Sequence, residues 1–123
     1  MGTHKDLIVW QKGIELVKEV YHVTQSYPQE ELWGLTSQIR RCVVSIPSNI
    51  AEGCGRHSDK ELIRFLYIAL GSAAELETQL IISRELSFLS PDKFDNISSL
   101  NSEIIRMVTA LLKQVKNKPG TNS

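Results

Sequence analysis

Basic side chains gather at two places in this 123-residue sequence, and their spacing suits contact with phosphate groups. Arg56, Lys60 and Arg64 follow one another at intervals of four residues, and Arg40 and Arg41 are adjacent further upstream. An arginine guanidinium can form paired hydrogen bonds with phosphate oxygens. Both groups are therefore candidate nucleic-acid contacts.

A structural role is the alternative for both groups. Acidic residues flank Lys60 in the sequence, and a carboxylate inside the protein would pair with Arg40 or Arg41; the candidates are Glu52, Glu75 and Glu77. Lys and Arg together number 14, as do Asp and Glu, so the whole-chain charge gives no argument for a nucleic acid or a membrane as partner. An electrostatic function therefore requires local separation of charge.

A second polar group surrounds a proline within an apolar helical pattern. Ser45, Asn49 and Glu52 lie around Pro47, and Asn49 and Glu52 share one helical face because they are three residues apart. A proline inside a helix frees a carbonyl, and polar side chains can bond to such a group. The alternative is a polar binding site shared with Arg56. The residues favour the structural role, and both interpretations stay open.

The sequence offers little that could support catalysis. Ser45, Ser48 and Ser72 have no histidine at a helical spacing that would activate them, and Glu75 and Glu77 point to different faces of a helix. The segment GCGR lacks the strand and the lysine of a phosphate-binding loop. We therefore predict a protein that is not an enzyme and uses no cofactor.

The cysteines and histidines predict neither a disulfide nor a metal site. Cys42 and Cys54 are twelve residues apart in one expected helix, hence about 18 Å apart, beyond the reach of a disulfide. His4, His22 and His57 show no metal-ligand spacing. Free cysteines indicate a reducing, cytoplasmic setting. The N-terminal residues lack the pattern of a signal peptide, and no apolar run approaches the ~20 residues of a membrane span.

Helical periodicity predicts the elements that position these residues. In residues 35–56 apolar side chains recur at steps of three and four, which predicts one helix, kinked at Pro47 and ended by Gly53 and Gly55. A preceding helix begins at Leu7 and ends before Pro28. It carries two adjacent apolar seams, which suit burial in a bundle with a second face against another subunit.

Two further helices follow. Ser58 and Glu61 form a capping-box pattern at the start of a long helix that we expect to reach about Leu89. Small residues at positions 71–74 predict close approach of a neighbouring backbone at its centre. Ser90 followed by Pro91 marks the start of the last helix, which continues to residue 116.

Together these elements predict an all-α fold. No window alternates with period two for long enough to form a strand. Four helices with short connections favour an up-down antiparallel four-helix bundle, with residues 1–116 as a single domain and residues 117–123 as a disordered tail.

The segment SIPSNIAEGCGR, with GLTSQIRR before it and FLYIALGSAAELETQL after it, resembles the bacterial four-helix-bundle proteins of the 23S ribosomal RNA intervening-sequence family. The opening KDLIVWQKGIELVKEVY is similar to the start of that family. The resemblance implies the same bundle fold and assembly as rings of five. It also implies a more distant similarity to accessory proteins of diversity-generating retroelements, whose basic ring surface engages nucleic acid.

The resemblance marks particular positions of this sequence, none of which is a catalytic residue in the family. They are Arg40, Arg41, Ser45, Pro47, Asn49, Glu52, Gly53, Arg56, Glu75 and Glu77. The function expected from these observations is weak binding of RNA or DNA by a homopentamer, through a ring of basic side chains formed by Arg40, Arg41, Arg56, Lys60 and Arg64. The alternative is a protein–protein interaction scaffold that binds no nucleic acid.

Overall fold

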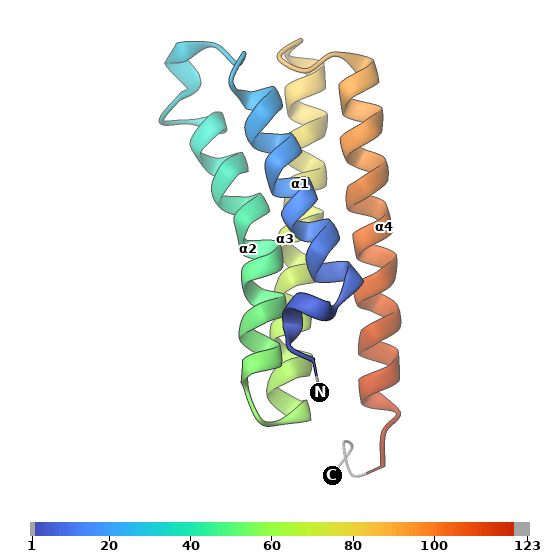
Figure 1. Ribbon diagram of the computed structural model, residues 1–123. Coiled ribbons are helices and arrows are strands. Elements are labelled where there is room, and N and C mark those ends of the chain that lie inside the picture. Colours follow the sequence, from blue (N-terminus) through green and yellow to red (C-terminus); the bar gives the residue numbers. More distant parts are fainter. Residues whose placement is uncertain (1, 120–123) are drawn as a thin grey trace.

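The chain folds into four antiparallel helices, seen in the computed structural model that describes residues 2–119 (Figure 1). The helices are α1 (Ile8–Thr24), α2 (Leu35–Gly55), α3 (Asp59–Glu85) and α4 (Pro91–Lys116). Two short 3₁₀ turns, His4–Asp6 and Gln29–Glu31, precede α1 and α2. Residues 2–119 contain no strand. The predicted all-α, up-down four-helix bundle is confirmed.

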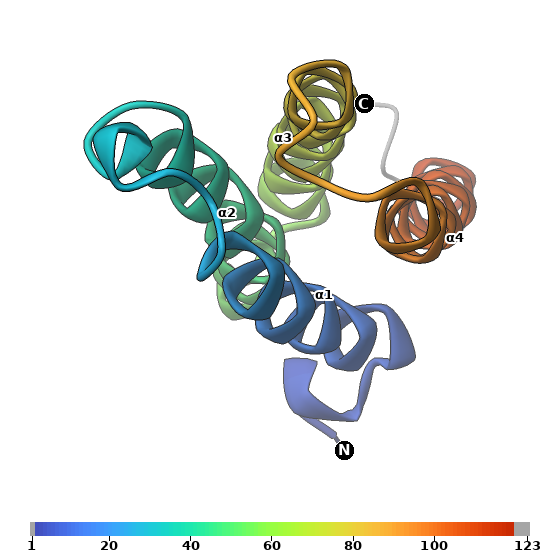
Figure 2. The same cartoon turned by 90° about the horizontal axis from the view of Figure 1, so that it is seen from above.

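The helices occupy the four corners of the bundle when it is viewed along its axis (Figure 2). Neighbouring helices pack in the order α1–α2–α3–α4, and α4 closes the square against α1. Helices α1 and α3 are therefore diagonal to one another, as are α2 and α4. The interior is mainly apolar, and each helix contributes fully buried side chains, such as Leu16, Ile46, Leu76 and Ile104.

Helix α2 has the bounds that periodicity predicts, and it continues through Pro47. Its upper part leans away from its lower part in Figure 1, as expected where a proline interrupts the backbone ladder. Pro47 is buried against α1 at Gly13, where an added Cβ would lie 3.2 Å from the Pro47 Cβ. Because Gly13 has no side chain, the Pro47 ring can pack closely against the α1 backbone.

Close packing of α2 on α3 depends on Gly53. A Cβ at this position would lie 2.9 Å from the Phe65 Cβ. The prediction that Gly71 marks a close approach is wrong, because a Cβ there would meet nothing within 4 Å. The small residues that do pack are its neighbours: Ala73 is 1% exposed, and the Ser72 carbonyl accepts a hydrogen bond from the Cys42 thiol.

Helix α3 ends four residues before the expected position near Leu89. Ser87 has φ of 63°, the left-handed conformation usually taken by glycine. The Phe88 amide donates to the Ser83 carbonyl (2.9 Å) and the Ser87 amide to the Arg84 carbonyl (3.0 Å), which is the Schellman pattern of helix termination. With no glycine to mark this end, periodicity alone extends the helix too far.

Only some of the apolar residues of α4 face the interior. Leu100, Met107 and Leu111 are only partly buried, whereas Asn101 and Leu112 lie in the interior. Asn101 is 1% exposed and donates from Nδ2 to the Ala73 carbonyl (2.9 Å). A buried amide bonded to a specific backbone group fixes α4 against α3 at one height along the bundle.

Helix α3 is more apolar than expected, because no stretch was predicted to approach the length and hydropathy of a membrane span. It contains an 18-residue window of mean hydropathy 1.3, so by length and composition it could cross a membrane. A core helix of a bundle has the same character, and the inner face of α3 is buried against α2 and α4. Its outer face also carries apolar residues, since Ile68, Ile81 and Ile82 are about two-fifths exposed.

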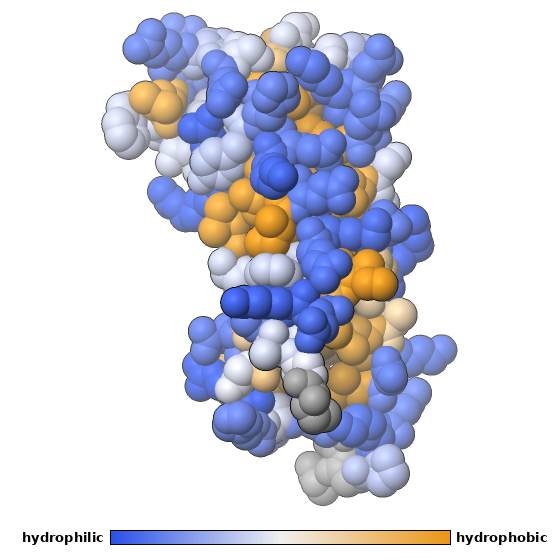
Figure 3. All heavy atoms as spheres, viewed as in Figure 1, coloured by the Kyte–Doolittle hydropathy of each residue, from blue (hydrophilic) through white to orange (hydrophobic). Residues whose placement is uncertain are grey.

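Exposed apolar residues interrupt an otherwise polar surface (Figure 3). On the face drawn there, hydrophobic side chains gather in the middle, over α1 and α2, and again along the lower half of α4. Ile14 and Tyr21 of α1 and Val44 of α2 are among the exposed apolar residues. Of the two predicted seams of α1, the one through Val9 and Leu16 is buried, and the other is only partly covered.

Candidate nucleic-acid interface

The antiparallel fold separates charge along the bundle. Residues 2–15, 46–71 and 105–119 form the half that contains the α2–α3 connection and both described ends of the chain (Figure 1). This half holds nine Lys and Arg and five Asp and Glu, and the other half holds five and nine. A chain with zero net charge therefore has one basic end and one acidic end.

The basic end is defined by six cationic residues in α3 and α4 or directly after α2 and α4: Arg56, Lys60, Arg64, Lys113, Lys116 and Lys118. Three of these were predicted as nucleic-acid contacts, and the lysines of α4 were not. The sequence alone shows only that Lys113 and Lys116 lie in the last turn of α4, where positive charge interacts favourably with the helix dipole. Only the antiparallel pairing of α3 with α4 brings them beside Lys60 and Arg64.

The two arginines of the basic end, Arg56 and Arg64, both lie over the ring of Phe65. The guanidinium carbons of Arg56 and Arg64 lie 5.2 and 4.4 Å from the centre of its ring. Arg56 also pairs with Glu52 (3.0 Å) and Arg64 with Glu61 (3.2 Å), both on the exposed surface. The hydrogen bond from Arg64 is the main reason that the pKa of Glu61 is lowered. Exposed pairs of this kind are weak and can exchange a carboxylate for a phosphate.

The lysines of this end are less engaged. Within residues 2–119, Lys60 and Lys113 form no ion pair, and Lys118 pairs with Asp59 (3.1 Å). The Lys116 ammonium donates a hydrogen bond to the Tyr67 hydroxyl (2.9 Å), and that tyrosine is 49% exposed. The predicted tail, residues 117–123, includes Lys118 as its second residue, and residues 120–123 lie outside the described part of the chain.

Arg40 and Arg41 lie in the acidic half, about 22 Å along α2 from Arg56 at ~1.5 Å per residue. The fold does not bring the two predicted basic groups together. Arg40 donates to the Thr24 hydroxyl (2.9 Å) and to the Tyr21 carbonyl (3.5 Å), and its guanidinium carbon lies 4.7 Å from the centre of the Tyr21 ring. These contacts of Arg40 connect α2 with the C-terminal end of α1.

The expected carboxylate partners of these arginines are therefore wrong. Arg40 bonds to α1, and Arg41 is exposed and donates to the Ser37 hydroxyl (3.4 Å). Glu75 accepts a hydrogen bond from Gln79, and Glu52 pairs with Arg56. Arg41 remains a predicted phosphate contact of its own, separate from the basic end.

The polar residues near Pro47 mainly bond within the bundle. The Asn49 amide donates to the Ser45 carbonyl (2.7 Å). The Ser45 hydroxyl donates to the Cys42 carbonyl and pairs with the Ser72 hydroxyl of α3, at 2.6 Å each. Glu52 takes no part in this network.

The two cysteines are free, as predicted. Burial and then the charge of Glu75 raise the pKa of the Cys42 thiol to about 12, and burial raises the pKa of Cys54. Both thiols therefore stay protonated near neutral pH and are poor nucleophiles. In the part of the chain that the structure describes, no three His, Cys, Asp or Glu residues are arranged to hold a metal ion.

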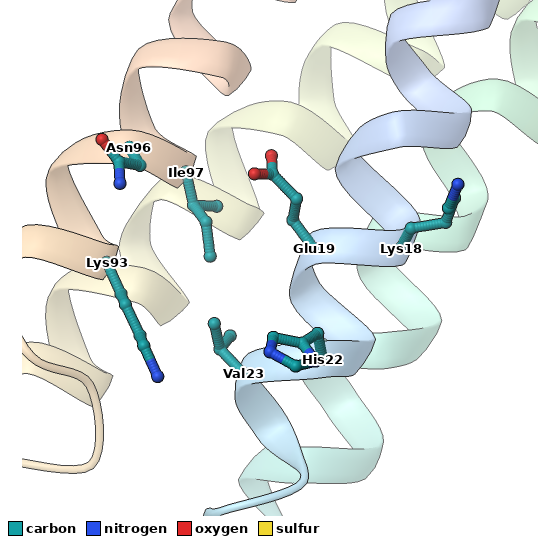
Figure 4. A pocket seen from close by; sticks show the side chains of 7 residues that line it. All are labelled: Lys18, Glu19, His22, Val23, Lys93, Asn96 and Ile97. Carbon is teal, nitrogen blue, oxygen red and sulfur yellow. The ribbon is translucent and has the colours of Figure 1, made fainter.

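A groove of about 260 Å³ lies between α1 and α4 in the acidic half (Figure 4). Val23 and Ile97 face each other across it, Glu19 points toward α4, and Lys18 points away. Burial and then the charge of Glu15 raise the pKa of Glu19. Carboxylate, imidazole and ammonium groups all border this groove, so its charge does not select one class of ligand.

The fold defines the class of protein as an up-down four-helix bundle with a polarised charge distribution. Residues 5–110 match the sequence model of the 23S rRNA-intervening sequence protein family, and the chain belongs to that family. The predicted resemblance is thus confirmed. No curated protein matches the chain.

A solved structure of similar fold supports the architecture. It is a protein of unknown function from the S23 ribosomal protein family of Bacteroides thetaiotaomicron, 24% identical to this chain. The two superpose with a TM-score of 0.80 over 86% of this chain and 96% of the other. At this identity the likeness concerns the fold alone.

Proposed function

We propose that this protein binds RNA or DNA through the basic end of the bundle and performs no catalysis. The separation of charge carries the proposal, because the half of the bundle that contains the basic end has an excess of four positive charges in a chain whose net charge is zero. Lys and Arg contacts to phosphates supply most of the affinity in sequence-independent binding. Free, protonated thiols are consistent with a cytoplasmic setting, which is part of the proposal.

The proposal includes assembly of the protein as a homopentamer, which the family resemblance implies. A ring needs two different complementary surfaces on each protomer. Exposed apolar residues lie on α1 (Ile14 and Tyr21) and on the diagonal helix α3 (Ile68, Ile81 and Ile82), on opposite sides of the bundle. Five copies would present the basic end five times, so weak phosphate contacts would gain avidity.

Fluorescence anisotropy with labelled nucleic acids tests the proposal. The probes are a ribosomal-RNA stem-loop and an unrelated single strand, each titrated at low and at physiological salt. Binding should weaken as salt rises, because bound phosphates release counterions. A preference for the stem-loop would connect the function to the ribosomal insertion. Absence of binding at low salt would contradict the proposal.

Charge reversal locates the interface. Lys60→Glu with Arg64→Glu should abolish binding at low salt, since it changes the basic end by four charges. Lys18→Glu with Lys93→Glu is the matched control, because it makes the same change on exposed lysines of the acidic half. Equal loss in both double variants would point to a nonspecific effect of net charge.

A protein-binding scaffold is the second candidate, and Trp33 favours it. This side chain is 89% exposed, and the adjacent Leu32 is 42% exposed, at the end of the bundle opposite the basic residues. Exposed tryptophans are frequent anchors of protein interfaces. Trp33→Ala should leave RNA binding unchanged, and loss of a nuclease-resistant protein partner in that variant would favour the scaffold.

A further inference from the structure

A groove of about 320 Å³ opens between α3 and α4 at the basic end. Tyr67 and Leu70 of α3 form one wall, and the other comes from the last turns of α4, with Thr109, Leu112, Lys113, Lys116 and Asn117. Leu112 is 4% exposed and Tyr67 49%, so the groove has an apolar floor and an accessible aromatic ring.

The charge of this groove has one sign. Two lysines line it and no Asp or Glu does, which distinguishes it from the mixed groove between α1 and α4. Lys60 lies seven residues before Tyr67 on α3, two turns away on the same helical face. Positively charged side chains therefore extend from Lys113 and Lys116 in the groove to Lys60, near the connection between α2 and α3.

The Tyr67 ring is held at its edge, which leaves ring surface accessible. Its hydroxyl accepts the hydrogen bond from Lys116, whose ammonium lies 5.4 Å from the ring centre. A ring positioned in this way can stack on a flat ligand. Thr109 and Asn117 add neutral donors and acceptors at the opposite wall.

A flat ligand with an attached anion fits these features. Leucine side chains and an aromatic ring suit a planar heterocycle, and the flanking ammonium groups suit a phosphate. In a duplex, both faces of each base are already stacked on neighbouring pairs, whereas a base in a single strand is free to enter a groove. The geometry therefore selects the single-stranded form.

We infer that this groove binds one nucleotide unit of single-stranded RNA or DNA, with its base stacked on Tyr67 and its phosphate on Lys113 and Lys116. The inference rests on the proposed function and specifies its substrate class. Stacking of one base on an aromatic side chain is worth about 1–3 kcal/mol, a factor of about 5 to 150 in affinity.

A single-stranded RNA oligonucleotide containing 2-aminopurine tests the stacking directly, because stacking quenches the fluorescence of this base. The wild-type protein should quench it. Tyr67→Leu should remove the quenching and weaken single-strand binding about 5- to 150-fold, with binding of an RNA duplex unchanged. Tyr67→Phe is the matched control that keeps the ring and loses the hydroxyl bond to Lys116, and it should keep the quenching.

The outcomes separate this inference from the proposed function. If Tyr67→Leu quenches and binds as the wild type does, while Lys60→Glu with Arg64→Glu abolishes binding, the stacking site is wrong and the basic end stands. Equal loss of quenching in Tyr67→Leu and Tyr67→Phe would also overturn stacking. If the wild type binds neither probe at low salt, both proposals fail. Circular dichroism melting confirms that the variants are folded, as expected for a half-exposed residue.

Discussion

Single residues decide where the helices of this bundle can touch. Gly53 permits the contact of α2 with α3, and Gly13 permits the contact of α1 with Pro47. Gly71, which belongs to the stretch where the sequence predicts a close approach, faces open space. The same residue type therefore has opposite effects on stability at different positions, since a glycine helps a helix only where a neighbour fills the space of its missing side chain.

Substitution of these glycines by alanine should shift stability in opposite directions. Gly71→Ala should stabilise the protein by roughly 0.5–1 kcal/mol, because alanine is the better helix former and nothing obstructs its Cβ. Gly53→Ala should destabilise it by about 1–3 kcal/mol, because its Cβ would lie 2.9 Å from that of Phe65. Urea unfolding measures both, and a stabilised Gly53→Ala would contradict the packing described.

The Cys42 thiol should make stability fall at alkaline pH. Its folded pKa is about 12, whereas an unfolded thiol titrates near pH ~8.5. Between these values the unfolded chain releases a proton that the folded chain keeps, so the stabilising effect is complete below about pH 8.5 and is lost as pH rises toward 12. Melting temperatures at about pH 8 and 10.5 should therefore drop more in the wild type than in Cys42→Ala. Equal drops would show that the thiol is not linked to folding.

At the scale of the helices, proline and capping serine residues in the sequence predict helix boundaries correctly. Pro28 and the Ser90–Pro91 pair mark boundaries that the structure confirms, because proline and a capping serine act through the backbone next to them. Ser58 also caps α3, accepting from the Glu61 amide (3.3 Å), although the Glu61 carboxylate pairs with Arg64 and not with the Ser58 backbone. A capping box is thus only half formed.

The end of α3 offers a test of a strained cap. Ser87 takes the left-handed conformation at φ of 63°, at a position where glycine costs less. Ser87→Gly should stabilise the protein by about 0.5–1 kcal/mol, since relief of strain exceeds the added entropy of the unfolded chain. Ser87→Ala is the control and should not stabilise it. Thermal unfolding compares the three proteins, and a destabilised Ser87→Gly would show that the serine side chain stabilises this turn.

The whole bundle has one basic and one acidic end, and exposed apolar residues that include Ile14 and Tyr21 of α1 and Ile68 and Ile82 of α3. The proposed ring uses these apolar residues for assembly and leaves the basic end for nucleic acid. Exposed isoleucines alone are ordinary on a monomer. Their presence on the outer sides of two diagonal helices is what would suit a closed ring.

The ring proposal predicts a mass of about 70 kDa in solution, five times the 13.9 kDa chain. Tyr21→Glu on α1 and Ile82→Glu on α3 should each reduce it to the mass of the monomer, because each ring contact uses the apolar residues of both helices. Glu77→Lys, on an exposed position of α3 outside the apolar group, is the control. Light scattering after size exclusion measures the mass. A monomeric wild type at micromolar concentration would contradict the ring.

The four helices and their order can be predicted from the amino-acid sequence alone. Apolar periodicity and the proline and serine signals are local, so the bounds of α2, the start of α4 and the bundle fold could be predicted, as could Arg56, Lys60 and Arg64 as a group. The sequence also suggested a structural role for Ser45 and Asn49, but their hydrogen bonds go to the carbonyls of Cys42 and Ser45, not to the Val43 carbonyl that Pro47 leaves without its helical donor.

The side-chain contacts between helices could not be predicted from the sequence and follow from the packed bundle. In the folded protein Arg40 bonds to Thr24 near the end of α1, and the buried Asn101 bonds to the Ala73 carbonyl. Tyr67 lies beside Lys116, forty-nine positions away in the chain. Folding also divides a neutral chain into oppositely charged halves. Pairings of this kind depend on helix rotation and relative height. Those are set by the packing of all four helices together, because a small rotation exchanges buried and exposed positions without changing any local pattern.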